Sequence, residues 1–294
     1  MTHVQRYLNR IGYRGQLQPD RALLDELLRL HVATIPFENV TSYAPGPSPG
    51  GAVDLDPDAV ADKLLGVVDG GPRRGGYCME HATLLQTVLP QLGFAVRSAW
   101  GRVIPEPGGV PGTRTHYVTV VAIGGRDLLV DPGNGGMTPT GTIDLGDRGT
   151  VQSTPHDRYR VMSPADAGVD VTSAPDADAV LQLQMITDGE SSWRSLYTLD
   201  LSPVSPRDVA VANWFVSTSP ASPFTGTLMA ALATKDARIT LANNMFRRRS
   251  ARAVDKRTLT GPEDLRVAFD ELQIDASAES IAAVSARLFD GERH

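Results

Sequence analysis

Apolar side chains in the first ninety residues recur every three or four positions, which is the spacing of one face of an α-helix. Four helices are predicted, from Val4, Tyr7, Leu8 and Ile11; from Leu23, Leu24, Leu27, Leu28 and His31; from Val60, Leu64 and Leu65; and from Leu84, Leu85, Val88, Leu89 and Leu92. Asp20 is suited to cap the second helix, and Pro57 to begin the third. Gly70-Gly71 should stop the third helix, and Pro90 should bend or end the fourth.

From Phe94 onwards the apolar side chains alternate with polar ones, which is the period of a half-buried β-strand. Six strands are predicted, at Phe94–Ile104, His116–Ile123, Asp127–Asp131, Arg158–Met162, Val180–Ile186 and Trp193–Leu201. Because no helical pattern separates them, their sheet should be mainly antiparallel and form a barrel or a sandwich.

The last third of the chain mixes the two periods. Helices are predicted at Arg207–Phe215, Pro262–Leu272 and Ala278–Leu288, and strands at Arg238–Ala242 and Ala253–Thr260. The proline-containing segments Tyr43–Gly51 and Ser163–Asp178 are predicted to be loops. The sequence therefore predicts an α+β protein, with a helical domain at residues 1–93, a β-domain at 94–202 and an α/β domain at 203–294.

The composition is that of an ordinary globular protein with an acidic balance. The 294 residues are 41% apolar and 21% charged, which excludes a fully disordered chain. A net charge of −6 predicts no broad positive surface for nucleic acid or for an anionic membrane. No apolar run has the length of a signal peptide or a membrane helix, so a cytoplasmic protein is expected.

The single cysteine, Cys78, is the most informative residue of the chain. With no partner of its own kind it forms neither an internal disulfide nor a multi-cysteine zinc site, and a reducing compartment is favoured. Cys78 follows Gly75-Gly76 at a predicted helix start, where the helix dipole and unpaired N–H groups favour a thiolate. Arg73-Arg74 act in the same direction. A small buried apolar side chain is the alternative interpretation.

A nucleophilic thiol needs a base, and hairpin geometry points to His116. The strand that begins at His116 turns at Gly124-Gly125 and returns to Asp131. A two-residue turn places Asp131 opposite Val118, and therefore diagonal to His116 on one face, with Cα atoms about 7–8 Å apart. A carboxylate there fixes the imidazole tautomer and supports its charged form. A Cys78–His116–Asp131 relay follows if the sheet brings this hairpin to the cysteine; a locally bonded strand-end histidine is the alternative.

The remaining candidates are weaker. His81, three residues after Cys78 on the same helix, is predicted to support the site or to be exposed, rather than to act as the base. His31 lies on a leucine-rich face and is predicted to be packed there. The glycine-rich stretch Asp131–Gly136 can approach a phosphate or an acyl oxygen, although a plain turn is the alternative. No spacing of histidines and cysteines predicts a metal site.

Several short motifs occur in the order typical of one family. They are Ile35-Pro36-Phe37-Glu38-Asn39, Arg74-Gly75-Gly76-Tyr77-Cys78, Thr115-His116, Val130-Asp131, Asn213-Trp214 and Ser217-Thr218-Ser219-Pro220-Ala221-Ser222-Pro223-Phe224. In these motifs the chain resembles the arylamine N-acetyltransferases, from about residue 5 to 285. The resemblance implies a helical bundle, an antiparallel β-barrel and an α/β lid. It also implies a cysteine-peptidase-like Cys-His-Asp core between the first two.

The resemblance also assigns roles to individual residues. It implies acetyl-CoA as co-substrate, no tightly bound cofactor and ping-pong chemistry, in which Cys78 takes the acetyl group, His116 activates the thiol and Asp131 holds His116. The acceptor would be an arylamine, an arylhydrazine or an N-hydroxyarylamine. The other implied site residues are Phe37, Val103, Asn134 and Phe224 for the acceptor, Thr113, Gly133, Gly135 and Ser222 for CoA, and Glu38 with Arg73 or Arg74 as a buried supporting pair.

Two stretches depart from the usual pattern of that family. Similar proteins carry Phe-Glu-Gln-Asn after the cysteine, where this chain has Met79–Ala82, and polar Asn134 stands where an aromatic residue usually lines the acceptor pocket. A larger or more polar amine is therefore possible. The alternative functions are a macrolactam-forming amide synthase supplied by a carrier protein, a cysteine hydrolase, and a non-catalytic binder of CoA or an aromatic amine. The run Arg247–Arg249 is interpreted as a solvated face, with steering of CoA as the alternative.

Overall fold

The computed structural model describes residues 1–44, 52–67, 72–170, 172–187 and 189–291. Its N-terminal elements are α1 (His3–Arg10), α2 (Arg21–Thr34), β1 (Phe37–Glu38), α3 (Val40–Tyr43), α4 (Pro57–Leu65), α5 (Cys78–Val88) and the 3₁₀ turn η1 (Pro90–Leu92). The four predicted helices are confirmed as α1, α2, α4 and α5. The predicted stop at Gly70-Gly71 and most of the predicted loop Tyr43–Gly51 lie outside the described residues.

Local sequence signals account for the ends of these helices. The Asp20 carboxylate caps α2 by accepting a hydrogen bond from the Leu23 N–H (2.9 Å). Pro57 is the first residue of α4 and needs no hydrogen-bond acceptor there. Helix α5 ends at Val88, ahead of Pro90, which begins η1. The apolar faces of α1, α2, α4 and α5 then meet in one buried cluster.

The middle of the chain forms an antiparallel β-barrel that is nearly closed. Its strands are β2 (Ala95–Val103), β3 (Arg114–Ile123), β4 (Arg126–Val130), β5 (Ile143–Asp144), β6 (Gln152–Ser153), β7 (Arg158–Met162), β8 (Ala179–Thr187) and β9 (Glu190–Asp200). They lie in the order β5-β4-β3-β2-β9-β8-β7-β6. The Asp144 N–H donates to the Gln152 side chain (2.8 Å), which brings the two end strands together. The six strands predicted here are confirmed, and β5 and β6 are additional.

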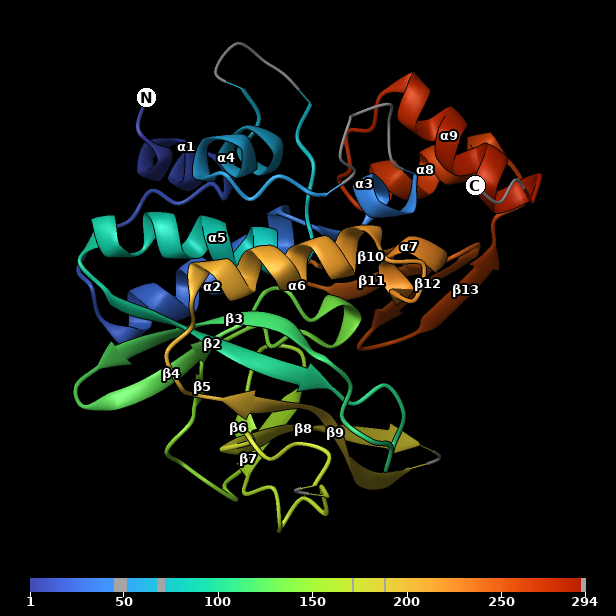
Figure 1. The fold of residues 1–294 in the computed structure, drawn as a ribbon. Coiled ribbons are helices and arrows are strands. Elements are labelled where there is room, and N and C mark those ends of the chain that lie inside the picture. Colours follow the sequence, from blue (N-terminus) through green and yellow to red (C-terminus); the bar gives the residue numbers. More distant parts are fainter. Residues whose placement is uncertain (45–51, 68–71, 171, 188, 292–294) are drawn as a thin grey trace.

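The last third adds helices and a second, five-stranded sheet. It contains α6 (Pro206–Thr218), α7 (Pro223–Gly226), β10 (Met229–Ala233), β11 (Ala237–Ala242), β12 (Met245–Ser250), β13 (Val254–Thr258), α8 (Pro262–Glu271) and α9 (Ala278–Phe289). The sheet order is β1-β10-β11-β12-β13, so a strand from the N-terminal region pairs with the C-terminal one. In Figure 1, α8 and α9 lie on one side of this sheet and the barrel lies on the other.

Strands β10 and β12 were not predicted from the sequence. Strand β10 consists of Met229-Ala230-Ala231-Leu232-Ala233, in which apolar residues do not alternate with polar ones and alanine favours helix. Strand β12 carries the run Arg247–Arg249, whose charges conceal its single buried aromatic residue, Phe246. The alternating pattern is absent because one face of β10 packs in the C-terminal core and the other lines an internal cavity, so neither face is an ordinary solvent-exposed surface.

The fold class agrees with the prediction, whereas the domain boundaries at 93/94 and 202/203 stay a prediction. No helix among the described residues is long and apolar enough to cross a membrane.

Two histidines lie inside the helical core, on facing sides of α2 and α5. His31 Nε2 and His81 Nδ1 are 2.8 Å apart, and the Tyr7 hydroxyl lies 3.2 Å from His31 Nδ1. The packing predicted for His31 is confirmed, but exposure of His81 is wrong because both side chains are fully buried. Burial lowers the pKa of His81 to about 4 and that of His31 well below its ordinary value.

We expect this histidine pair to make the fold sensitive to acid. The folded-state pKa of His81 is about 4, against about 6.5 when unfolded, so the unfolded chain binds more protons between these values. The contribution of His81 to the free energy of unfolding is therefore fully present above pH 6.5. It falls by about 3 kcal/mol as the pH drops towards 4. Urea unfolding of a His81→Gln variant between pH 4 and 7.5 should show a shallower loss than the parent. Equal slopes for His81→Gln and the parent would contradict the assignment.

Candidate active site

The hairpin of β3 and β4 places His116 beside Asp131. The strands are joined by Gly124-Gly125, and Thr119 pairs with Val130, which is the predicted register. His116 Nε2 donates to Asp131 Oδ2 over 2.9 Å, and both side chains are almost completely buried. The side chains therefore meet as the sequence geometry predicted.

Asp131 is fixed by further hydrogen bonds in addition to that from His116. The Tyr197 hydroxyl, from β9, donates to Oδ2 (2.7 Å), and the Gly133 N–H donates to Oδ1 (2.9 Å). Burial alone would raise the pKa of Asp131, but the charge and hydrogen bond of His116, with these other donors, hold it below its usual value. Asp131 is therefore a buried carboxylate at neutral pH.

The same contacts decide the charge of His116. Burial alone would lower its pKa, but the Asp131 carboxylate and hydrogen bonds with Asp131 and Cys78 outweigh burial and raise it to about 10. The imidazole is therefore charged at neutral pH. Because Nε2 is used by Asp131, Nδ1 is the ring nitrogen left to face the Cys78 sulfur. An imidazolium beside the sulfur favours the thiolate.

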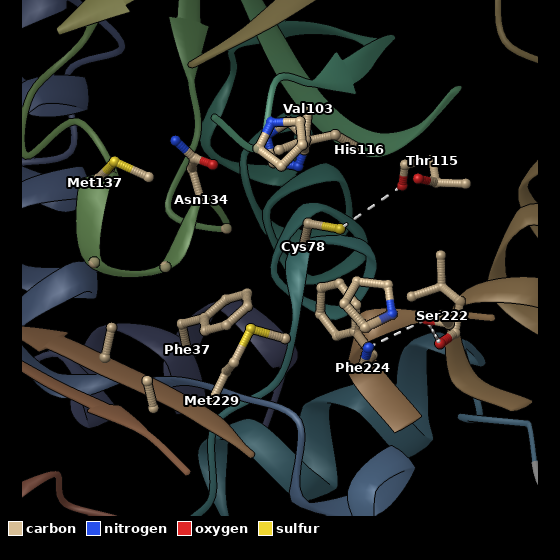
Figure 2. A pocket seen from close by; sticks show the side chains of 18 of the residues that line it. Phe37, Cys78, Val103, Thr115, His116, Asn134, Met137, Ser222, Phe224 and Met229 are labelled. Carbon is tan, nitrogen blue, oxygen red and sulfur yellow. Dashed lines mark hydrogen bonds between the residues drawn. The ribbon is translucent and has the colours of Figure 1, made fainter. Parts of the chain in front are cut away.

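Cys78 is the first residue of α5, so the helix leaves its backbone N–H unused. The N-terminus of α5 is closed by Glu80, which accepts a hydrogen bond from the Tyr77 N–H (3.0 Å). Gly133 passes so close that a Cβ there would lie 2.6 Å from the Cys78 Cα, so this position requires glycine. Figure 2 shows Cys78 between His116 and Phe224 at the wall of a pocket.

A buried ion-pair network lies behind the cysteine. Glu38 receives two hydrogen bonds from the Arg74 guanidinium (2.8 and 3.0 Å) and one from the Val40 N–H (2.7 Å). Lys63 bridges Glu38 and Glu80, at 3.7 and 2.6 Å. Burial alone would raise the pKa of Glu38, but the Arg74 and Lys63 charges and the Val40 N–H lower it.

The structure distinguishes the two arginines that the resemblance left open. Arg74 is the partner of Glu38, whereas the Arg73 side chain is exposed and its backbone N–H donates to Asp275. The backbone places Arg74 and not Arg73 beside Glu38, because the Glu38 N–H donates to the carbonyl of Gly76, two residues after Arg74 (2.8 Å). Gly75 touches the Pro36 carbonyl so closely that no side chain fits.

A cavity of about 480 Å³ opens over the cysteine. All the residues predicted to contact substrate or CoA line it, namely Phe37, Val103, Thr113, Gly133, Asn134, Gly135, Ser222 and Phe224. The walls come from the barrel, from α6 and α7, and from β10 and β11, so the C-terminal part contributes as much as the barrel. Among the described residues, the Asn134 Nδ2 atom is buried without a hydrogen-bond partner. Its Oδ1 is the amide atom left for the cavity.

Three positioning residues were missed from the sequence. Tyr197 binds Asp131 from a distant strand, and no local motif marks it. Asn39 holds the wall of the cavity: it donates to the Phe224 and Thr227 carbonyls and accepts from the Met229 N–H (2.7 Å). Asn213 bonds the Tyr77 hydroxyl. Asn39 and Asn213 stand in two of the motifs that carry the resemblance, which was the available signal, but no role was assigned to them.

No group of three or more histidine, cysteine or acidic side chains within the described residues could hold a metal ion.

Known proteins resemble this chain in sequence and in fold. A family model described as N-acetyltransferase matches residues 20–279. The arylamine N-acetyltransferase of Mycobacterium tuberculosis (strain ATCC 25618 / H37Rv) is 36% identical over 93% of this chain and 86% of its own length. A Salmonella typhimurium protein named arylamine N-acetyltransferase / N-hydroxyarylamine O-acetyltransferase is 32% identical over 84% of this chain and 79% of its own. The Mycobacterium marinum arylamine N-acetyltransferase in complex with CoA has a TM-score of 0.82 at 33% identity, covering 98% of both chains.

An Asp131→Asn variant should weaken the thiolate. Without the carboxylate, burial dominates, and the pKa of His116 should fall from about 10 to below its ordinary value near 6.5. Alkylation by iodoacetamide, followed at pH 7 by mass, reports on Cys78 alone because it is the single cysteine. We expect the rate to fall at least tenfold. Asp127→Asn, which removes a half-exposed carboxylate of β4 that is paired with Arg97, is the control that should react like the parent. An unchanged rate for Asp131→Asn would refute the ion pair.

A Glu38→Gln variant should destabilise the protein by about 3 kcal/mol, since it leaves Arg74 without its buried counter-charge and Lys63 with Glu80 alone. Urea unfolding measures this loss. Glu26→Gln is the matched control, because Glu26 pairs with Arg29 at the surface and should cost about 0.5 kcal/mol or less. Equal losses of unfolding free energy in the two variants would mean that the buried network stabilises the fold no more than a surface ion pair does.

Proposed function

Since this chain belongs to the arylamine N-acetyltransferase family, we propose that it transfers an acetyl group from acetyl-CoA to an aromatic amine through an acetyl-cysteine intermediate at Cys78. The observation that carries the proposal is the buried His116–Asp131 pair, which lines one cavity together with Cys78. Thiolate attack on a thioester exchanges one carbon–sulfur bond for another, so the intermediate keeps the reactivity of its donor.

The proton balance follows from the charge of His116. In the first half, the Cys78 sulfur bonds to the acetyl carbonyl, the bond to the CoA sulfur breaks, and His116 gives its proton to the departing thiolate. In the second half, the amine nitrogen bonds to the carbonyl and the bond to Cys78 breaks. Neutral His116 takes the proton that the amine loses, which restores the ion pair. The unused Cys78 N–H is the proposed donor to the oxyanion.

The proposed acceptors are arylamines, arylhydrazines and N-hydroxyarylamines. Phe37, Val103 and Phe224 give the cavity apolar faces against which an aromatic ring packs. Asn134 adds an amide oxygen, which favours acceptors that carry a second N–H or O–H donor beside the reacting amine.

Intact mass after mixing the protein with acetyl-CoA, in the absence of amine, tests the intermediate. We expect the gain of one acetyl group in the parent and none in Cys78→Ser, which keeps the size of the side chain but is a far weaker nucleophile. Addition of aniline should remove the adduct and yield acetanilide.

Three other results would each replace the proposal. An adduct that decays at the same rate without aniline would indicate a hydrolase. CoA binding without an adduct would indicate a binding protein, and neither adduct nor CoA binding would favour a carrier-protein donor and an amide synthase. Circular dichroism of Cys78→Ser checks that the variant is folded.

A further inference from the structure

The loop that follows β4 forms one wall of the cavity, and within the described barrel no neighbouring strand pairs with it. Residues 131–138, here called the 131–138 loop, begin with Asp131 and contain three glycines. Figure 2 shows Asn134 and Met137 on this loop, at the same pocket as Cys78. Glycine loses more backbone freedom on folding than any other residue, so contacts from outside must hold the shape of this loop.

Thr138 closes the loop on itself. Its hydroxyl donates to the Asp131 carbonyl (2.5 Å) and accepts a hydrogen bond from the Asn134 N–H (3.2 Å). Its own N–H donates to the Gly135 carbonyl (3.2 Å), across the 3₁₀ turn η2 (Gly135–Met137). The position of Thr138 therefore sets the position of the cavity-lining residues that precede it.

Arg238, on β11 of the C-terminal sheet, holds Thr138 from outside the loop. Its Nη2 donates to the Thr138 carbonyl (2.7 Å) and to the Tyr159 hydroxyl (3.2 Å), which itself donates to that carbonyl (3.0 Å). Its Nε donates to Asp157 Oδ2 (2.6 Å), in an ion pair whose side chains are only 4% and 9% exposed. One buried guanidinium therefore joins the C-terminal sheet to the barrel and to the loop.

The loop also lies against β11 at a second point. Two residues before Thr138, Gly136 is so close to β11 that a Cβ there would lie 2.6 Å from Thr240 Cγ2. Thr240 follows Arg238 by two residues on the same strand, so both side chains point to the same face of the sheet. Because Thr240 lines the cavity, the bond from Arg238 is made on the cavity face, one step further along the strand.

The charges around Arg238 include a second arginine that does not touch the loop. Arg249, on β12, is the direct cross-strand partner of Arg238, and like charges in that arrangement destabilise a sheet. Asp157 compensates both, since Arg249 Nη2 donates to its Oδ1 (2.8 Å). Burial alone would raise the pKa of Asp157, but the two arginines lower it. Among the described residues Arg249 bonds Asp157 and has no hydrogen bond to the 131–138 loop.

We propose that Arg238 is a positioning residue for the acceptor. It holds the 131–138 loop against β11, so that Asn134 and Met137 keep the wall against which the aromatic amine binds. The effect on catalysis rests on the proposed function, whereas the hold on the loop does not. Asp131 keeps its hydrogen bonds from His116 and Tyr197 without Arg238, so the reactivity of Cys78 should be preserved.

Hydrogen–deuterium exchange of the loop amides tests the hold directly. Arg238→Lys keeps a positive charge beside Asp157 but lacks the planar fork that reaches the Thr138 carbonyl at the same time. Tyr159→Phe removes the other donor to that carbonyl with little change of shape. In both variants the 131–138 loop should exchange about tenfold faster than in the parent, while helix α5 keeps its protection.

Arg249→Gln is the matched control. It takes one arginine from Asp157, as Arg238→Lys weakens the other, but it removes no contact of the 131–138 loop. Its loop should therefore exchange like that of the parent, even if the free energy of unfolding of the variant is lower.

The kinetic consequence is a difference between the two halves of the reaction. With p-aminobiphenyl as acceptor, kcat/KM for the amine should fall about tenfold in Arg238→Lys and in Tyr159→Phe, mainly through KM, because the wall that orients the ring is displaced. Alkylation of Cys78 by iodoacetamide should stay within about twofold of the parent in both variants, since the thiolate environment is kept. Arg249→Gln should keep both values.

Three results would overturn the inference. If the loop of Arg238→Lys and Tyr159→Phe exchanges like that of the parent, Arg238 does not hold it. If protection is lost throughout the molecule, or alkylation of Cys78 falls together with kcat/KM for the amine, Arg238 supports the whole fold or the whole site. If the loop loosens but kcat/KM for the amine is unchanged, the loop does not position the acceptor. Failure of the proposed function is recognised separately, as absence of Cys78 acetylation in the parent, and the exchange experiment then still decides the hold on the loop.

Discussion

The buried ion pair between Glu38 and Arg74 is the interaction on which the rest of the site depends. It secures the contact between β1 and the Gly75-Gly76 stretch, after which the chain enters α5 at Cys78. Because β1 also pairs with β10, one short segment joins the helical core, the five-stranded sheet and the cysteine. Removing a single partner from such a pair leaves an uncompensated buried charge. Loss of either Glu38 or Arg74 should therefore also disturb the path of the chain into α5.

A second buried pair, His116 with Asp131, also has to offset the free energy of burying charge, and it does so with additional hydrogen-bond donors. The carboxylate is surrounded by donors from three places: His116 on β3, Tyr197 on β9, and the backbone of Gly133. These donors replace the water that burial removes, so that both groups stay charged. Glycine at 133 is needed twice, for its N–H and for the close approach of the Cys78 backbone. The charge that results beside the sulfur is what a thiol nucleophile requires.

The five-stranded sheet serves both the core and the site because its two faces are chemically different. One face carries Leu232, Ile239 and Phe246 and packs against the last two helices. The other face is the wall of the cavity near β10 and β11 and becomes cationic at Arg247 and Lys256. A strand alternates its side chains between faces, so Arg247 and Arg249 lie on the open face, whereas Arg248 lies beside Ile239 on the face that carries the apolar residues.

The sequence by itself determined the features that depend on neighbours along the chain. Helix starts, strand periods and the two-residue Gly124-Gly125 turn are local, and the turn alone fixed the meeting of His116 with Asp131. Only the tertiary structure decided which arginine reaches Glu38, that His81 is buried against His31, and that Tyr197 holds Asp131. It also decided that the alanine-rich β10 is a strand. Each of these depends on contacts between residues far apart in the chain, where packing and desolvation outweigh local propensity.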